Sequence, residues 1–108
     1  MTINYNGEDL ELKFTFNSFR YLEDFNIQDL EDVQHKIFKM FSISRQLLMA
    51  ALNKEPSRKF TFADVDAILE PHAEDGSIVE IFGGLSELLV DSGFFKSLQA
   101  MGERAQKA

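Results

Sequence analysis

The sequence predicts an α+β domain in which an N-terminal β-hairpin packs on a bundle of four to five helices. Residues 2–16 alternate apolar and polar side chains around an Asn6-Gly7 turn, as in a half-buried hairpin. From residue 18 onward, apolar residues recur at three- and four-residue intervals, as in amphipathic helices. The 108 residues contain no cysteine and suit one domain with one hydrophobic core.

The hairpin is predicted to pair residues 2–6 with residues 10–16. Asn6-Gly7 is a strong hairpin-turn signal between these two segments. One face of the second strand is expected to carry Leu10, Leu12, Phe14 and Phe16. Because an isolated hairpin is only marginally stable in water, we expect this face to rest on helices.

A first helix is predicted over Ser18–Phe25, because Asn17-Ser18 supplies an N-cap. Its apolar residues, at helical spacing, are Phe19, Leu22 and Phe25. A short second helix is predicted next, because three apolar residues then recur every third position: Ile27, Leu30 and Val33.

The central helix is predicted over Lys36–Asn53. Its polar residues fall in one narrow sector of the helical wheel and are Lys39, Ser42, Gln46 and Asn53. The wide apolar arc that remains is typical of a helix packed on several sides. Arg45 interrupts this arc, and two interpretations stay open: a snorkelling or carboxylate-paired side chain, or a contact for a partner.

Two further helices follow a polar loop over residues 54–59. Thr61 and Asp64 form a variant of the capping box, and Pro71 is expected to end this helix before a loop over residues 72–76. Ser77 and Glu80 form a capping box for the next helix. The apolar stripe of that helix is Ile78, Ile81, Phe82, Leu85, Leu88 and Leu89.

Two glycines and a last apolar stripe predict how the C-terminal helices pack and where they end. Gly83 lies on a face of small residues, which predicts close approach of another helix to Val79, Gly83, Ser86 and Val90. Gly93 suits the C′ position of a helix, with Phe94 packing back on Leu89. The last stripe is Phe95, Leu98 and Met101. We therefore expect one domain over residues 1–101 and a frayed tail over residues 102–108.

The net charge of −7 is unevenly distributed along the chain. Residues 1–32 hold 8 acids and 2 bases, residues 33–59 hold 1 acid and 6 bases, and residues 60–108 hold 9 acids and 3 bases. This balance disfavours nucleic acid as a partner, because its affinity comes mainly from phosphate neutralisation. The basic middle segment either balances the acidic elements or forms a docking surface for an acidic partner, such as another copy of the chain.

The residues indicate a protein that acts by binding and not by catalysis. His35 and His72 are its two histidines, and neither has a partner at metal-ligand spacing. The sequence holds no glycine loop that would cradle a phosphate and no calcium-loop ligand series. We therefore assign no catalytic, cofactor-binding or metal-binding residue. No signal peptide or membrane span is predicted.

Two adjoining segments carry a family resemblance, INYNGEDLELKFTF and NSFRYLEDF. The residues that match are Phe14, Phe16, Asn17, Arg20, Leu22 and Glu23. The central helix, the acidic segment Phe60–Leu69 and the final Phe94-Phe95-Lys96 agree in character and position. In these features, over nearly its whole length, the chain resembles the short tail assembly chaperones of long-tailed phages and prophages.

The resemblance implies a chaperone that binds the tape measure protein and keeps it soluble until tail tube subunits polymerise around it. It also implies action in the cytoplasm of the bacterial host, absence from the mature virion, and assembly as a homo-oligomer. Further partners implied are the tail tube protein and a longer, frameshifted form of the chain. Neither nucleic acid nor a membrane is expected to be a partner.

The C-terminal half carries more apolar helical stripe than a domain of this size easily buries. The residues that we expect to contact a partner are Arg45, Ile81, Phe82, Leu85, Phe94, Phe95 and Leu98. The alternative is that the apolar members of this set are all core. Two other functions stay open: another phage or prophage structural component, such as a head–tail completion or tail protein, and a small acidic regulator that binds a protein.

Overall fold

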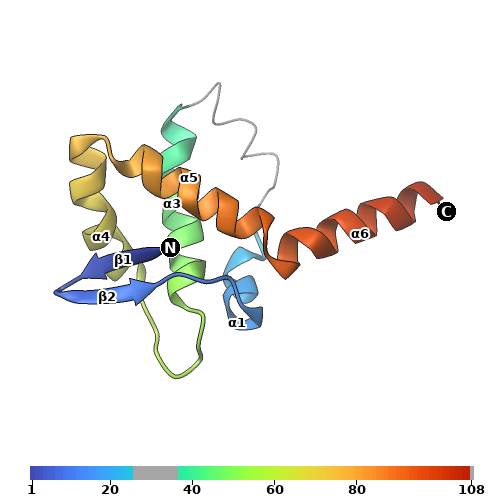
Figure 1. Ribbon diagram of the computed structural model, residues 1–108, viewed down its shortest axis with the longest axis horizontal. Helices are drawn as coiled ribbons and strands as arrows, with labels where there is room; N and C mark the ends of the chain where they lie inside the picture. The colour runs from blue at the N-terminus through green and yellow to red at the C-terminus, as the bar shows by residue number, and fades with distance from the viewer. Residues whose placement is uncertain (26–36, 108) are drawn as a thin grey trace.

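A computed structural model describes residues 1–25 and 37–107, which form the predicted α+β fold (Figure 1). An antiparallel hairpin of β1 (Thr2–Tyr5) and β2 (Glu8–Glu11) precedes the helices. The helices are α1 (Phe16–Phe19), the 3₁₀ helix η1 (Arg20–Leu22), α3 (Ile37–Leu52), α4 (Phe62–Asp75), α5 (Ile78–Val90) and α6 (Gly93–Lys107). The predicted short helix around Ile27–Val33 and His35 lie outside the described residues.

The hairpin turns at Asn6-Gly7 as the sequence predicts. Asn6 and Gly7 have φ angles of 53° and 81°, the left-handed conformation that a tight two-residue hairpin turn needs. The second strand ends at Glu11, earlier than predicted, where its register with Thr2 of β1 ends; beyond it, the amide of Leu12 donates one further hydrogen bond to the carbonyl of Met1 at 2.8 Å. Leu10, Leu12 and Phe14 still reach the core, but Phe16 is 92% exposed and not part of the buried face.

The first helix begins earlier than predicted, and its cap is Thr15 and not Asn17-Ser18. Thr15 and Ser18 exchange backbone-to-side-chain hydrogen bonds in a capping box. The Thr15 hydroxyl also donates to the carbonyl of Lys54 at 2.7 Å. Asn17 donates instead to the carbonyl of Asn53 at 2.8 Å, so its amide joins α1 to the end of α3.

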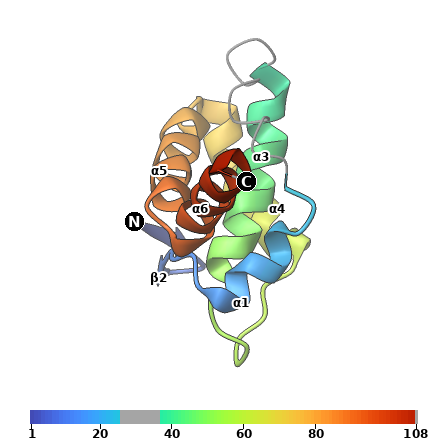
Figure 2. The same cartoon turned by 90° about the vertical axis from the view of Figure 1, so that its right-hand side faces the viewer.

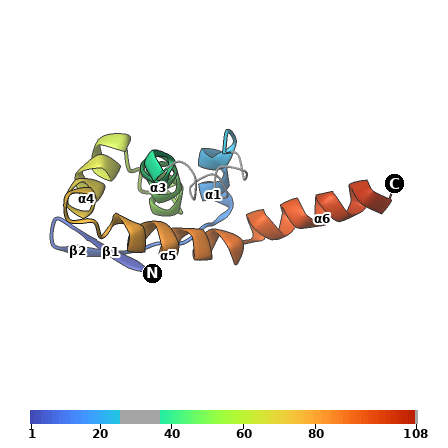
Figure 3. The ribbon, with the colours of Figure 1, turned by 90° about the horizontal axis from the view of Figure 1, so that it is seen from above.

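Helix α3 is the centre of the core, and its bounds lie within one residue of the prediction at each end. In Figure 3 it lies between α4 and α1, with α5 running along one side. The fully buried residues of α3 include Leu47, Leu48, Ala50 and Ala51. Asn53, predicted to lie in the polar sector of the helix, is instead buried at its end.

Pro71 does not end α4, contrary to prediction. The helix continues to Asp75 and ends at Gly76, whose φ of 85° is the left-handed conformation that glycine favours. Proline removes the N–H that would bond to the carbonyl of Ala67. Both residues are exposed, so this lost bond is not a buried unsatisfied group. His72 therefore lies in the helix, half-buried, and not in a solvated loop.

Ser77 does not cap α5 with its side chain, which also corrects the prediction. Its hydroxyl donates to Asp75 and lies 2.6 Å from Nδ1 of His72. These partners lie at the turn between α4 and α5, so the hydroxyl does not bond to the amides at the start of α5. Among the described residues, nothing lies within 4 Å of a Cβ added at Gly83. Val79 and Val90 of the same predicted face are exposed, whereas Ser86 is half-buried and its hydroxyl is out of solvent. The close approach occurs at Gly84, where an added Cβ would lie 2.7 Å from Sδ of Met1.

Changing Gly83 to Ala is expected to raise the free energy of unfolding by about 1 kcal/mol. Nothing lies within 4 Å of a Cβ added there, so the gain in helix propensity meets no steric cost. Gly76→Ala is the matched control, and it should destabilise because of its positive φ. Urea denaturation of both variants measures the two effects. Destabilisation by Gly83→Ala would show that a helix does pack on this face.

Candidate protein-interaction surface

Ser92 joins α5 directly to α6. Its hydroxyl donates to the carbonyl of Leu89 at 2.5 Å and accepts from the amide of Phe95 at 3.5 Å. Gly93 is therefore the first residue of α6 and not the C′ residue of α5, which corrects the prediction. Because Ser92 provides the start of a new helix at once, the chain does not fold back, and Phe94 does not complete a Schellman motif.

Helix α6 runs away from the rest of the molecule. Figures 1 and 3 show it extending beyond the other helices, and in Figure 2 it points toward the viewer. Phe94 anchors its first turn, with its ring centroid 5.4 Å from that of Phe19. Further along, Leu98 is 39% exposed and Met101 is 68% exposed. The helix continues to Lys107, past residue 101, and fraying of the tail from residue 102 stays a prediction.

A shallow groove of about 520 Å³ lies where α6 leaves the body. Its lining residues are Phe19, Leu22, Glu23, Asp24, Phe25, Phe94 and Leu98. Apolar side chains from α1, η1, the following turn and α6 therefore meet beside two exposed carboxylates. We call the groove together with Phe95 and Met101 the α6 surface.

The predicted apolar partner contacts separate into three places. Phe94, Phe95 and Leu98 lie together on the α6 surface. Ile81 and Phe82 are half-buried on α5 and pack against the core. Leu85 is fully buried, so the expectation that it contacts a partner is wrong for this structure: it is a core residue.

Arg45 is held by its own chain, far from α6 in sequence. Its guanidinium makes two hydrogen bonds to Asp66, of 2.7 and 3.1 Å, and lies 4.0 Å from the ring centroid of Phe62. The hydrogen bond to Arg45 lowers the pKa of Asp66 and raises the pKa of Arg45. The carboxylate-paired interpretation of Arg45 is confirmed.

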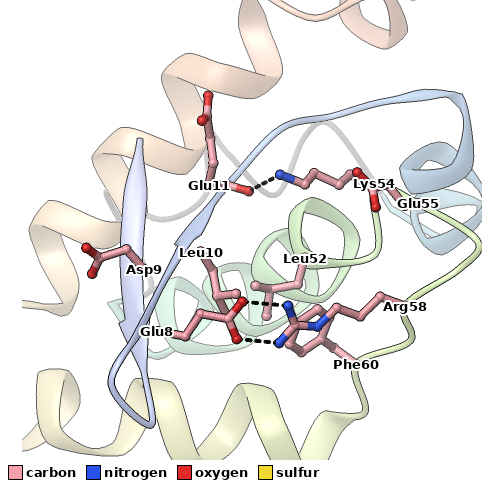
Figure 4. A pocket seen from close by; sticks show the side chains of 9 residues that line it. All are labelled: Glu8, Asp9, Leu10, Glu11, Leu52, Lys54, Glu55, Arg58 and Phe60. Atoms are coloured by element: carbon pink, nitrogen blue, oxygen red, sulfur yellow. Dashed lines mark hydrogen bonds and ion pairs between the residues drawn. The ribbon is translucent and has the colours of Figure 1, made fainter.

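Other bases of the middle segment are also engaged within the chain. Figure 4 shows the hollow between β2 and the loop after α3, where Arg58 makes two 2.7 Å hydrogen bonds to Glu8. That hydrogen bonding lowers the pKa of Glu8. Lys54 donates to the carbonyl of Glu11 at 2.8 Å. Arg45 and Arg58 thus pair with carboxylates of the same chain, as the charge-balancing interpretation predicts, while Lys54 bonds to a main-chain carbonyl.

The groove was missed at the sequence level because its two sides are about seventy residues apart in the chain. Helical periodicity predicts Phe19 and Phe25 as members of one apolar stripe and indicates no site role for Glu23 or Asp24. The sole signal was that Phe95, Leu98 and Met101 form a stripe at the end of the chain. Periodicity identifies such a stripe but does not say which segment lies beside it.

No helix in the described part of the chain is long and apolar enough to cross a membrane. Within residues 1–25 and 37–107, no group of three His, Asp or Glu side chains is arranged to hold a metal ion. A comparison with protein-family models finds no match, and comparisons with curated proteins and with solved structures find none either.

Proposed function

We propose that this protein is a phage tail assembly chaperone that binds the tape measure protein through the α6 surface. The observation that carries the proposal is the projecting α6, whose apolar stripe lies exposed beside the groove. The resemblance of the N-terminal block to such chaperones supports the same function. The role requires binding alone, without catalysis or a cofactor.

The mode of binding would be helix against helix. An exposed stripe with members three and four residues apart matches the apolar face of an amphipathic partner helix. A tape measure protein, as a long helical chain, offers many such faces, so many copies would bind along it. The net charge of −7 per copy would then keep the coated chain dispersed.

The remaining parts of the proposal follow from this role. The complex would form in the host cytoplasm before tail tube subunits polymerise, and the chaperone would be absent from the mature virion. The tail tube protein and a longer, frameshifted form of the chain are proposed as further partners. Detection of the chain in purified particles by mass spectrometry would instead favour a structural component of the virion.

Co-expression with the tape measure protein of the same genome tests the proposal. We expect soluble tape measure protein with this chain present and aggregated protein without it. The double variant Phe95→Asp, Leu98→Asp should lose co-purification, because two charges would interrupt the stripe. The exposed Val79→Asp on α5 is the matched control and should bind normally. An insoluble tape measure protein in every case would contradict a holdase role for this chain.

A further inference from the structure

Helix α6 differs in charge from the body that carries it. Residues 93–108 contain Lys96, Arg104 and Lys107 against Glu103 alone, a net charge of +2. Residues 1–92 hold 17 acids and 8 bases, a net charge of −9. Within one molecule, α6 leads away from this acidic body (Figure 3). The basic C-terminal end of α6 is therefore held away from the acidic side chains of its own molecule.

The apolar residues of α6 have the spacing of a two-helix seam. Phe94, Leu98, Met101 and Ala105 follow one another at intervals of four, three and four residues. This is the a/d spacing by which two helices pack along their length. Beyond Phe94, the described members Leu98 and Met101 are exposed, so the seam lacks its second helix.

We propose that two copies of this chain pair through α6 in antiparallel orientation. When the seams of the two helices pack against each other along their full length, Leu98 of each copy lies opposite Met101 of the other. Residue 94 then lies opposite residue 105. The groove at the base of each α6 then receives the C-terminal, basic end of the other helix. Glu23 and Asp24 line that groove, so the charges are complementary at both ends of the pair.

The charges also decide the orientation. A parallel pair would bring two bodies of net charge −9 side by side and would place both basic ends together. An antiparallel pair separates the bodies by the length of the helices, roughly 22 Å for 15 residues at 1.5 Å per residue. It is also a closed, two-fold arrangement, which limits assembly to a dimer. The pair would cover the same stripe that the proposed function assigns to the tape measure protein, so the two partners would compete for it; the dimer itself is tested on the protein alone.

Light scattering after size exclusion of the full chain at low salt is the first test. We expect a mass of twice 12.4 kDa that falls toward the monomer on dilution and with added salt. Leu98→Asp should give the monomer at all concentrations, with unchanged helicity by circular dichroism. Val79→Asp should stay dimeric. Glu23→Lys with Asp24→Lys should weaken the dimer about tenfold or more.

Disulfide trapping tests the orientation, because the chain has no cysteine of its own. A mixture of Leu98→Cys and Met101→Cys chains should cross-link to each other much faster than either variant does with itself. A monomeric wild type, a dimer that Leu98→Asp leaves intact, or faster linking within each single variant would overturn the antiparallel α6 pair.

Discussion

Replacing Asn53 with Ala is expected to lower the free energy of unfolding by about 2–5 kcal/mol, among the largest effects of any single change in this chain. The side chain is 1% exposed and links the end of α3 to the segment that leads into α4. Its carbonyl accepts from the amide of Phe60 at 2.9 Å, and its amide donates to the carbonyl of Phe60 at 3.2 Å.

The size of the effect comes from the groups left behind. Alanine would leave the amide and carbonyl of Phe60 without these partners in a buried place, and each unpaired group costs about 1–3 kcal/mol. The carbonyl of Met49 also accepts from the Asn53 side chain at 2.8 Å, but it keeps the backbone amide of Asn53 at 3.2 Å. The penalty is therefore concentrated at Phe60.

Urea denaturation of Asn53→Ala measures the loss directly. Asn4→Ala is the matched control, because Asn4 is exposed and its hydrogen bond to Asp9 lies in water. The control should change stability by no more than about 0.5 kcal/mol. Equal effects of the two variants would mean that water replaces the Asn53 amide at Phe60, and the polar link would then have no special role in holding α4 to α3.

The local signals in the sequence were sufficient for the hairpin turn, for the buried face of residues 10–14 and for the central helix. Asn6-Gly7 has few conformational alternatives, and the alternation of Leu10, Leu12 and Phe14 fixes which face is buried. The wide apolar arc of α3 likewise identified the helix against which α1, η1, α4 and α5 pack. In these elements the backbone preference and the burial pattern agree.

The signals failed where one side chain had several possible partners. Asn17 and Ser77 both suit a helix cap, but in the fold Asn17 bonds to the end of α3 and Ser77 bonds to Asp75. Pro71 predicts a helix end that α4 does not have, because water can reach the exposed carbonyl of Ala67 that proline leaves without its N–H donor. For the α6 surface, the sequence predicts the contacts on α6 itself but not the facing side of the groove, because Phe19 and Phe94 meet only through the tertiary fold.

Leu85 and Leu98 should respond in opposite ways to truncation, although the sequence places both on apolar helical stripes. Leu85→Ala should lower the free energy of unfolding by about 2–5 kcal/mol, because the side chain is 0% exposed and its removal leaves a cavity. Leu98→Ala should change it by less than about 1 kcal/mol, because the side chain is already partly in water and alanine favours the helix.

Comparing the unfolding free energies of Leu85→Ala and Leu98→Ala distinguishes a core residue from an interface residue only if the protein does not self-associate during the measurement. A dimer formed through α6 would add concentration-dependent stability, so denaturation should be measured on dilute, monomeric protein. Binding of the tape measure protein should then show the reverse order: Leu98→Ala weakens it, while Leu85→Ala, once folded, retains it. A stability loss at Leu98 as large as that at Leu85 would mean that the first turns of α6 belong to the core, and that the partner surface lies elsewhere on the molecule.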